Sequence, residues 1–363
     1  MAKQTPIPCV LMRGGTSKGP YFDLADLPAD EDTRNNVLLA AMGSPDIRQI
    51  DGIGGADSLT SKVAMVSKSK RDGIDIDYLF AQVSIDKAFV DTNPSCGNML
   101  SGIAPYALEK GWVPIQGETS EVTIYNVNTD SVIEAVIQTP DGAVNYDGDA
   151  AIDGVPGTAA PILLKFMGVA GSKTGKLLPT GKAKEEIDGI EVTCMDVAMP
   201  MVLMRAADLG ITGHETRDEL DANRALFERM EPIRQEAGRR MGLGDVSELV
   251  IPKIGLLSEP VDGGSISSRY FVPTSCHAAH AVTGGMCVAT CAVMEGTVAD
   301  GLSNVDRTAE ETIVIEHPSG KLKVELCVDG HGPDLDFVYG GVLRTARWLF
   351  EGNVFVPSDV WAG

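Results

Sequence analysis

Residues 95–111 read SCGNMLSGIAPYALEKG, and residues 275–296 read SCHAAHAVTGGMCVATCAVMEG. Each stretch begins with Ser-Cys, is apolar on most faces of a helix, and ends at a glycine that suits a helix C-terminus, Gly111 or Gly296. A helix that is apolar all round is a buried helix. Because the chain has no run of 18 apolar residues, we expect both helices to be buried inside protein rather than in a membrane.

A strand pattern follows each helix. Residues 121–139 alternate around the turn residues at 128–130, and residues 311–328 alternate around those at 318–320. Both stretches are typical of β-hairpins. The repeat predicts an α+β fold of two pseudo-symmetric domains, each with a sheet wrapped around a buried helix. In such a duplicated fold, each half would present one helix N-terminus to a ligand.

The domain boundary is predicted in the polar, glycine-bearing stretch 172–189. We expect a first domain at 1–185, possibly completed by the C-terminal segment 345–363, and a second domain at 186–344.

Other elements are predicted from the same patterns. Residues 61–68 and 76–84 read as strands, and 190–206 reads as one strand crossing toward the second half. Residues 215–242 form a charged, amphipathic helical insertion that we place mostly on the surface. Residues 340–357 are predicted to return, as helix or strand, to the first half.

Composition excludes several classes of protein. The 363 residues carry 30 Lys+Arg and 51 Asp+Glu, a formal net charge of −21, and 44% of them are hydrophobic. A nucleic-acid binder needs a basic surface, and a membrane-surface protein needs Lys/Arg clusters, so neither class is expected. Seven scattered cysteines do not form a disulfide framework, and no signal peptide is evident. We therefore expect a cytoplasmic protein with reduced thiols.

Residues 12–19, MRGGTSKG, follow a strand-like run and could approach a ligand closely. Successive backbone N–H groups in such a loop can cradle an anion, and two hydroxyls add donors. The alternative is an ordinary tight turn. The candidate binding residues of this loop are Gly14, Gly15, Thr16 and Ser17.

Residues 51–62, DGIGGADSLTSK, do not complete a dinucleotide-binding fingerprint, because Asp57 stands where the last glycine should be. Lys62 ends this stretch and opens an apolar strand. A lysine that is partly desolvated there is a candidate base. The alternative is a strand-end lysine in solvent.

Cys96 lies at the predicted start of the first buried helix, followed by Gly97, Asn98 and Met99. The helix dipole and the free N–H groups at such a position favour a thiolate or bind a carboxylate. The alternative is a buried structural cysteine.

The second half offers a corresponding set of candidates. Arg269 can bind a carboxylate through two hydrogen bonds. His277 and His280 are spaced as two metal ligands on a helix would be, but no third ligand has suitable spacing, so no metal is expected. The candidate binding residues here are Arg269, Ser275, Cys276, His277 and Ala278.

Together, the segments MRGGTSKG, DGIGGADSLTSK, SCGNML and CHAAHAVTGG resemble the 4-oxalomesaconate tautomerases/isomerases of the methylaconitate isomerase (PrpF-like) family. The resemblance spans nearly the full length and includes MGSPD at 42–46, HPSG at 317–320 and LRTAR at 343–347. It implies the diaminopimelate-epimerase-like fold. It also implies an isomerase of bacterial aromatic degradation, including that of protocatechuate, gallate and lignin-derived compounds.

The resemblance also implies residue roles. The acid/base lysine of the family falls on Lys62, and Cys96 faces it across the substrate as a possible second acid/base. Epimerases of this fold use a second cysteine in a Cys-Gly-Thr-Gly motif, where this chain reads Cys276-His277-Ala278-Ala279. This departure favours a lysine-centred isomerisation over a two-thiol mechanism.

The expected reaction is a 1,3-proton shift on a small polycarboxylate 2-keto acid, either allylic isomerisation or keto–enol tautomerisation, without a cofactor. Backbone N–H groups of Gly14–Ser17, Gly97–Asn98 and His277–Ala278 would stabilise the dienolate. The alternatives are a 2-methylaconitate cis/trans isomerase and a non-catalytic polycarboxylate-binding accessory protein of a dehydratase. A homodimer is possible.

A chain of charge −21 repels an anionic substrate, so attraction must be local. We expect it to come from Arg13, Lys18, Lys62, Arg269 and the two helix N-termini.

Overall fold

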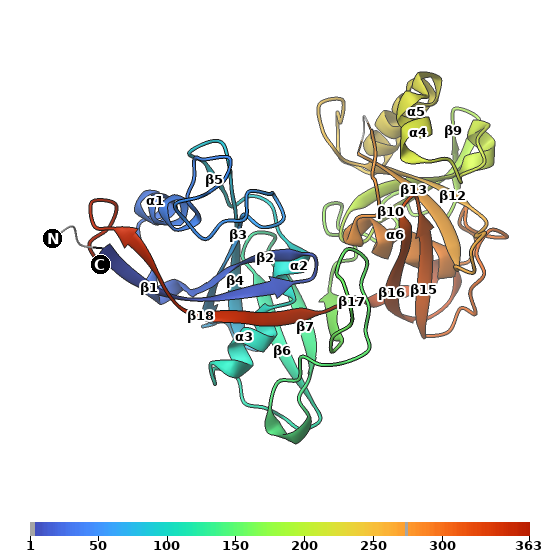
Figure 1. Ribbon diagram of the computed structural model, residues 1–363. Coiled ribbons are helices and arrows are strands. Elements are labelled where there is room, and N and C mark those ends of the chain that lie inside the picture. Colours follow the sequence, from blue (N-terminus) through green and yellow to red (C-terminus); the bar gives the residue numbers. More distant parts are fainter. Residues whose placement is uncertain (1–3, 273–274) are drawn as a thin grey trace. The chain divides into compact units, whose positions relative to one another are not determined.

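The computed structural model describes residues 4–272 and 275–363, and two compact units emerge from its contacts (Figure 1). The first unit comprises Met1–Lys165 and Leu343–Gly363, and the second comprises Phe166–Val342. The stretch 172–189, predicted as the domain boundary, lies inside the second unit, where its residues donate hydrogen bonds to a buried carboxylate. Asp196 is fully buried and accepts hydrogen bonds from Ser172, Lys173 and Thr174.

The first unit is a sheet with helices on both faces. Its helices are α1 (Glu31–Met42), α2 (Gly97–Leu100) and α3 (Ile103–Glu109). Its strands are β1 (Gln4–Gly14), β2 (Ser17–Asp23), β3 (Lys62–Lys68), β4 (Ile76–Val83), β5 (Val90–Asp91), β6 (Thr119–Asn126), β7 (Ser131–Gln138) and β18 (Ala346–Pro357), while β8 (Ile162–Met167) runs across the unit boundary.

The second unit is also a sheet with helices on both faces. Its helices are α4 (Arg217–Ala222), α5 (Arg224–Arg240) and α6 (Val282–Val293). Its strands are β9 (Glu185–Ile187), β10 (Ile190–Asp196), β11 (Pro200–Arg205), β12 (Lys253–Ser258), β13 (Ile266–Val272), β14 (Ser275–Cys276), β15 (Glu310–His317), β16 (Gly320–Asp329) and most of β17 (Asp336–Arg344), whose last two residues belong to the first unit. Short 3-10 turns are η1 (Leu24–Asp26), η2 (Pro140–Gly142), η3 (Ala206–Leu209) and η4 (Gly332–Asp334).

Strand pairing repeats between the units. In the first, β1–β2 and β3–β4 are antiparallel, whereas β2–β3 and β4–β6 are parallel. In the second, β10–β11 and β12–β13 are antiparallel, whereas β11–β12 and β13–β15 are parallel. The hairpins β6–β7 and β15–β16 complete each copy, as predicted. The α+β, pseudo-symmetric fold is therefore confirmed.

We call the face of each sheet that packs on α1 or α5 its outer face, and the face that packs on α2 and α3 or on α6 its inner face. On the outer face, α1 packs on one core cluster that contains Val63 and Met65, and α5 packs on another that contains Ile254 and Leu256. On the inner face lie α2 and α3 in the first unit and α6 in the second (Figure 1). Residues 284–293 of α6 are all buried, as the apolar sequence predicts. The insertion at 215–242 is helical, and its apolar side covers the outer face of the second sheet.

Two sequence expectations need correction. The second helix begins at Val282 rather than beside Cys276, which lies on strand β14. The predicted single strand at 190–206 is two antiparallel strands, β10 and β11, and Asp196 pairs with Pro200 across a turn in which Ala198 has a φ of 59°.

The end of the chain returns as strand. β18 pairs with β1 along its length, from Gln4 opposite Pro357 to Gly14 opposite Ala346. Val354 and Val356 of β18 join the outer core of the first unit. The C-terminal segment thus completes the first unit.

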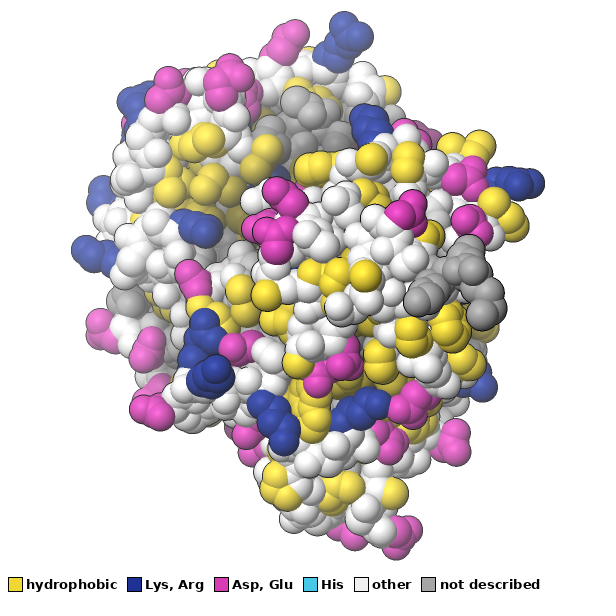
Figure 2. Space-filling model, turned by 90° about the vertical axis from the view of Figure 1, so that its left-hand side faces the viewer, with side chains coloured by type: hydrophobic (Ala, Val, Ile, Leu, Met, Phe, Trp, Pro, Cys, Tyr) yellow, Lys and Arg dark blue, Asp and Glu magenta, His cyan; other side chains and the backbone are white. Residues whose placement is uncertain are grey.

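Among the described residues, no helix is long and apolar enough to cross a membrane. Figure 2 shows acidic and basic side chains intermingled over the face that it draws, with no continuous basic surface there.

Candidate active site

The loop at residues 14–17 is a tight turn between β1 and β2, in which Gly14 pairs with Ser17. Gly15 has a φ of +52°, which favours glycine, and a Cβ there would lie 2.1 Å from the Asn98 side-chain oxygen. The Gly15 N–H donates to the Thr345 carbonyl at 2.8 Å, so it is not free to bind an anion. The buried hydroxyl of Ser17 has no hydrogen-bond partner among the described residues.

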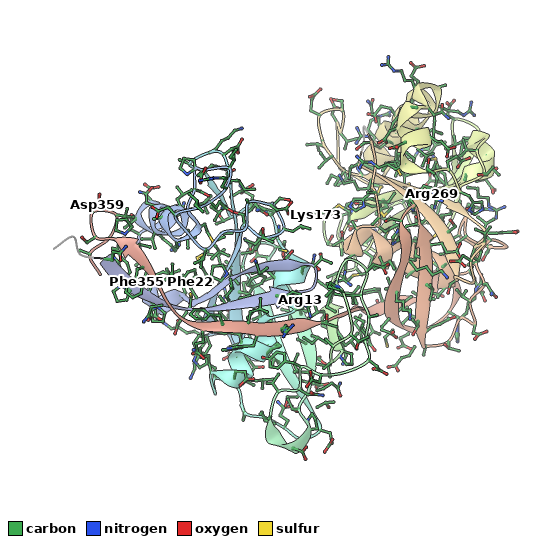
Figure 3. The ribbon with its side chains drawn as sticks, viewed as in Figure 1. Arg13, Phe22, Lys173, Arg269, Phe355 and Asp359 are labelled. Atoms are coloured by element: carbon green, nitrogen blue, oxygen red, sulfur yellow. The ribbon has the colours of Figure 1, made fainter. Side chains whose placement is uncertain are left out.

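Arg13 stabilises this turn by hydrogen bonds to its backbone. Its Nη1 donates to the carbonyls of Gly15 at 2.9 Å and Thr345 at 3.0 Å. Figure 3 shows Arg13 beside the turn, and desolvation together with the nearby Arg347 lowers its pKa. Arg13 therefore holds the shape of the loop, and its guanidinium is engaged by the protein.

Lys62 is the first residue of β3 and lies half-buried on the inner face. Its Nζ donates to the Gln82 side-chain oxygen at 2.5 Å and lies 5.2 Å from the centre of the Phe80 ring. The Gln82 amide nitrogen donates in turn to the Ser61 carbonyl at 2.8 Å, which fixes the orientation of the amide. Within the described ranges, no carboxylate pairs with Lys62, so its only polar partner is a neutral amide oxygen.

Cys96 is the N-cap of α2, as predicted, and its sulfur accepts from the Met99 N–H at 3.5 Å. The Gly97 and Asn98 N–H groups open the helix and have no acceptor within it. The Asn98 side chain donates to the Thr16 hydroxyl at 2.9 Å, so α2 and the 14–17 loop are directly bonded. Met99 is buried, and its methyl group lies near Gly19.

Three groups near Cys96 were not predicted. The Tyr78 hydroxyl donates to the Cys96 carbonyl at 3.2 Å. The Tyr21 hydroxyl donates to the Met99 carbonyl at 2.6 Å, from within the core. Arg344 lies nearby at the end of β17: burial lowers its pKa, and the adjacent Cys96 thiol opposes that shift. The one signal for Arg344 in the sequence was the LRTAR motif, from which no role was inferred.

In the second unit, Arg269 and Cys276 lie on the outer face, toward α4 and α5. The Arg269 Nε donates to the Glu215 carbonyl at 2.9 Å, and the side chain is buried (Figure 3). The Cys276 N–H donates to Asp221 at 2.6 Å, and the side chain joins the α5 core. Burial, reinforced by Asp221, raises the pKa of Cys276 to about 11, so this thiol is protonated at neutral pH.

The residues after Cys276 turn to the inner face. The His277 N–H donates to the Tyr270 carbonyl at 2.8 Å, and its Nδ1 accepts from Ala279 at 3.0 Å. His280 bonds the Ser268 hydroxyl and the Ala281 carbonyl, so both its ring nitrogens are engaged. Ser275 is half-buried on β14, and Ala278 is exposed.

The structure thus gathers the predicted residues of the first unit on one side of its sheet. There, Asn98 bonds Thr16, while Lys62 and Met99 flank Gly19. In the second unit, the predicted residues divide between the two faces.

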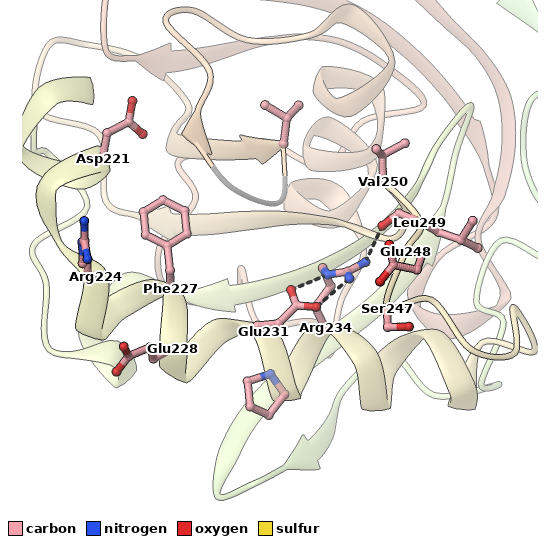
Figure 4. A pocket seen from close by; sticks show the side chains of 12 residues that line it. Asp221, Arg224, Phe227, Glu228, Glu231, Arg234, Ser247, Glu248, Leu249 and Val250 are labelled. Carbon is pink, nitrogen blue, oxygen red and sulfur yellow. Dashed lines mark hydrogen bonds and ion pairs between the residues drawn. The ribbon is translucent and has the colours of Figure 1, made fainter.

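A separate hollow of about 920 Å³ lies on the outer face of the second unit (Figure 4). Its wall includes Phe227 and the buried Arg234, which Glu231 holds at 2.7 Å. None of the predicted site residues lines it. Across the described part of the chain, no three His, Cys, Asp or Glu side chains gather as metal ligands would.

The chain is similar over nearly its full length to known proteins. Residues 4–357 match the family described as "PrpF protein". The chain is 51% identical to 4-oxalomesaconate tautomerase from Pseudomonas putida, over 99% of both chains. It is 52% identical to (4E)-oxalomesaconate Delta-isomerase from Novosphingobium sp., over 96% of this chain and 97% of the relative.

A crystal structure of methylitaconate-delta-isomerase superimposes with a TM-score of 0.90, at 36% identity, and the match covers 99% of this chain and 98% of that one. The family match takes in every residue placed above on the inner face of the first unit. The chain therefore belongs to the PrpF protein family.

Proposed function

We propose that this protein is a 4-oxalomesaconate isomerase that moves a proton between two carbons, with Lys62 as the acid/base. The observation that carries the proposal is an identity of 51–52% over nearly the whole chain to two relatives named for that substrate. The methylitaconate isomerase is less similar, at 36%. The setting of Lys62 supports the choice of base.

In this mechanism, the Lys62 amine removes a proton from a carbon that the neighbouring 2-keto acid makes acidic. Gln82 holds the Lys62 nitrogen at 2.5 Å without supplying a negative charge. An amine without a carboxylate partner can release and accept a proton more readily than one held as an ammonium by an anion. Such general acid–base catalysis contributes about 10²–10⁴-fold to the rate.

Negative charge that develops on the substrate needs fixed donors. The Gly97 and Asn98 N–H groups, the Ser17 hydroxyl and the Arg344 guanidinium are the donors we assign in the first unit. The backbone N–H groups of Gly15 and His277 are not assigned, because they donate to the carbonyls of Thr345 and Tyr270. The proton returns to the second carbon from Lys62 or from Cys96. The ketone itself acidifies the C–H bond, so the reaction as written needs no cofactor.

Proton NMR of the reaction in deuterated water tests the function. Purified protein is mixed with 4-oxalomesaconate and, separately, with 2-methylaconitate. We expect conversion of the first substrate at a kcat/KM at least tenfold above that of the second. Deuterium at one allylic carbon of the product identifies allylic isomerisation, whereas an enol product identifies tautomerisation. Absence of turnover with 4-oxalomesaconate would overturn the proposal.

The expected role in bacterial aromatic degradation, the cytoplasmic location and the homodimer stay predictions.

A further inference from the structure

Two arginines face each other near the end of the first sheet. Arg13 of β1 stands directly opposite Arg347 of β18 in the antiparallel pairing of these strands. Side chains that are directly opposite lie on the same face of a sheet, and like charges at such positions repel each other. Arg13 shows the effect, because desolvation and then the charge of Arg347 lower its pKa. The pair therefore costs folding free energy unless an anion lies beside the two guanidinium groups.

No carboxylate of the protein neutralises this pair. Within residues 4–272 and 275–363, neither arginine forms an ion pair with an aspartate or a glutamate. The Arg13 Nη1 donates to Gly15 and Thr345, but no hydrogen bond in this part of the chain engages its Nε or Nη2. These two nitrogens form one edge of the guanidinium. Arg347 is exposed, and its side chain makes no hydrogen bond to the described residues. Both side chains can therefore still donate to a ligand.

Both arginines line one cavity of about 270 Å³. The chain between residues 146 and 159 completes the wall and contributes Asp147 and Thr158. All of the described lining residues belong to the first unit. Drug-sized ligands occupy pockets of about 300–1,000 Å³, so the size of this cavity favours a small ion or metabolite.

The cavity is distinct from the candidate active site. Of the described residues that line it, none is the base or a donor assigned above. A Cβ on Gly14 would lie within 3 Å of the Asn98 carbonyl oxygen, so this position faces α2 on the inner side. Alternation along β1 turns the neighbouring Arg13 to the outer face. The two places are nevertheless connected, because Arg13 also bonds the Gly15 carbonyl in the turn at residues 14–17.

We propose that this cavity binds a small oxyanion, with Arg13 and Arg347 as its two cationic donors. The planar guanidinium group matches the oxygens of a carboxylate or a phosphate and can donate two parallel hydrogen bonds to them. Asp147 in the wall repels a ligand of high negative charge and so favours one with few anionic groups. The site goes beyond the proposed isomerase activity and does not depend on it.

Isothermal titration calorimetry with inorganic phosphate and, separately, with succinate tests the site and distinguishes its two possible ligand groups. Chloride is the only other anion in the buffer. We expect the wild type to bind at least one of the two anions with a Kd of about 1 mM or lower. Tighter binding of phosphate identifies a phosphate site, and tighter binding of succinate identifies a carboxylate site.

Variants of Arg347 link this binding to the cavity. Arg347→Met should weaken binding of the preferred anion about 10- to 100-fold, as expected for the loss of charge-assisted hydrogen bonds. Arg347→Lys should recover part of the loss, because it restores the charge but not the planar group. Arg229→Met removes an exposed arginine of α5 in the second unit and should bind as the wild type does.

Thermal melting without added anion checks the folded state of Arg347→Met. The variant removes the like-charge pair, so it should melt at or above the wild-type temperature. A clearly lower melting temperature would contradict the view that the two arginines repel each other.

Equal affinity of the wild type and Arg347→Met for the anion, or no binding of either anion by the wild type, would overturn the inference. Lys62→Ala should bind the anion as the wild type does. Lost binding in Lys62→Ala with unchanged binding in Arg347→Met would place the anion at the candidate active site, which also contradicts the inference. Because none of these measurements uses turnover, failure of the proposed isomerase activity would leave the anion site standing.

Discussion

The position of Lys62 is fixed by its neighbour across the sheet. The amide oxygen of Gln82 lies 2.5 Å from the Lys62 nitrogen, and Gln82 stands opposite Lys62 in the pairing of β3 with β4. The sequence marked Lys62 through the DGIGGADSLTSK run. It could not identify Gln82, because strand patterns predict two neighbouring strands but not which residues stand opposite each other.

Replacing Gln82 by Glu tests whether Lys62 needs an uncharged hydrogen-bond partner. The new carboxylate would hold the amine in its charged form, so we expect activity at neutral pH to fall about 10- to 1,000-fold and to recover partly at higher pH. Gln82→Met removes the acceptor without adding charge and should lose less activity. The pH profiles of kcat for both variants provide the measurement, and equal profiles would argue against this view of the base.

His280 makes folding sensitive to acid. Burial lowers its pKa to about 3, below the value near 6.5 of an unfolded chain. Between these values the unfolded state binds a proton that the folded state does not, so the free energy of unfolding decreases as the pH falls from 6.5 toward 3.

We expect His280→Gln to reduce this slope by about 1.4 kcal/mol per pH unit, the contribution of one proton. Urea unfolding at pH 4 to 6 measures it. His331→Gln, at an exposed residue, is the control variant. An unchanged slope in His280→Gln would show that the ring is protonated in the folded state.

At the scale of elements, the apolar patterns predicted a buried helix in each half and both hairpins, but the first helix is divided into α2 and α3. The matching Ser-Cys pairs do not occupy equivalent places in the two halves. Cys96 caps α2, but residues 277–281 separate Cys276 from α6, and they carry Cys276 onto a strand. The turn at Ala198 was not predicted. Two buried strands joined by a tight turn form one apolar run, and such a run has the pattern of a single strand.

The contact of β2 with β3 positions Lys62. A Cβ on Gly19 would lie 1.8 Å from the Lys62 carbonyl oxygen, which is backbone and cannot move aside. Gly19→Ala should lower the free energy of unfolding by about 1–3 kcal/mol and reduce activity by shifting Lys62. Chemical denaturation and turnover assays measure the two effects. For stability, Gly97→Ala is the matched control, because a Cβ there meets nothing within 4 Å.

For the molecule as a whole, the sequence predicted a duplicated α+β fold, and the pairing order of the strands confirms it. It also predicted the return of the chain end to the first unit, where β18 completes the sheet along β1. The partners of Arg269 and Arg344 depend on contacts between residues far apart in the chain, which no local pattern contains. The net charge of −21 leaves attraction of an anionic substrate to a few local groups.

The most direct test of the central claim is the turnover of 4-oxalomesaconate by Lys62→Ala beside Lys68→Ala. Both lysines belong to β3, but Lys68 is exposed at its far end. Lys62→Ala should fold as the wild type does and lose at least 100-fold in kcat, while Lys68→Ala should retain wild-type activity. Near wild-type turnover by folded Lys62→Ala would contradict the account.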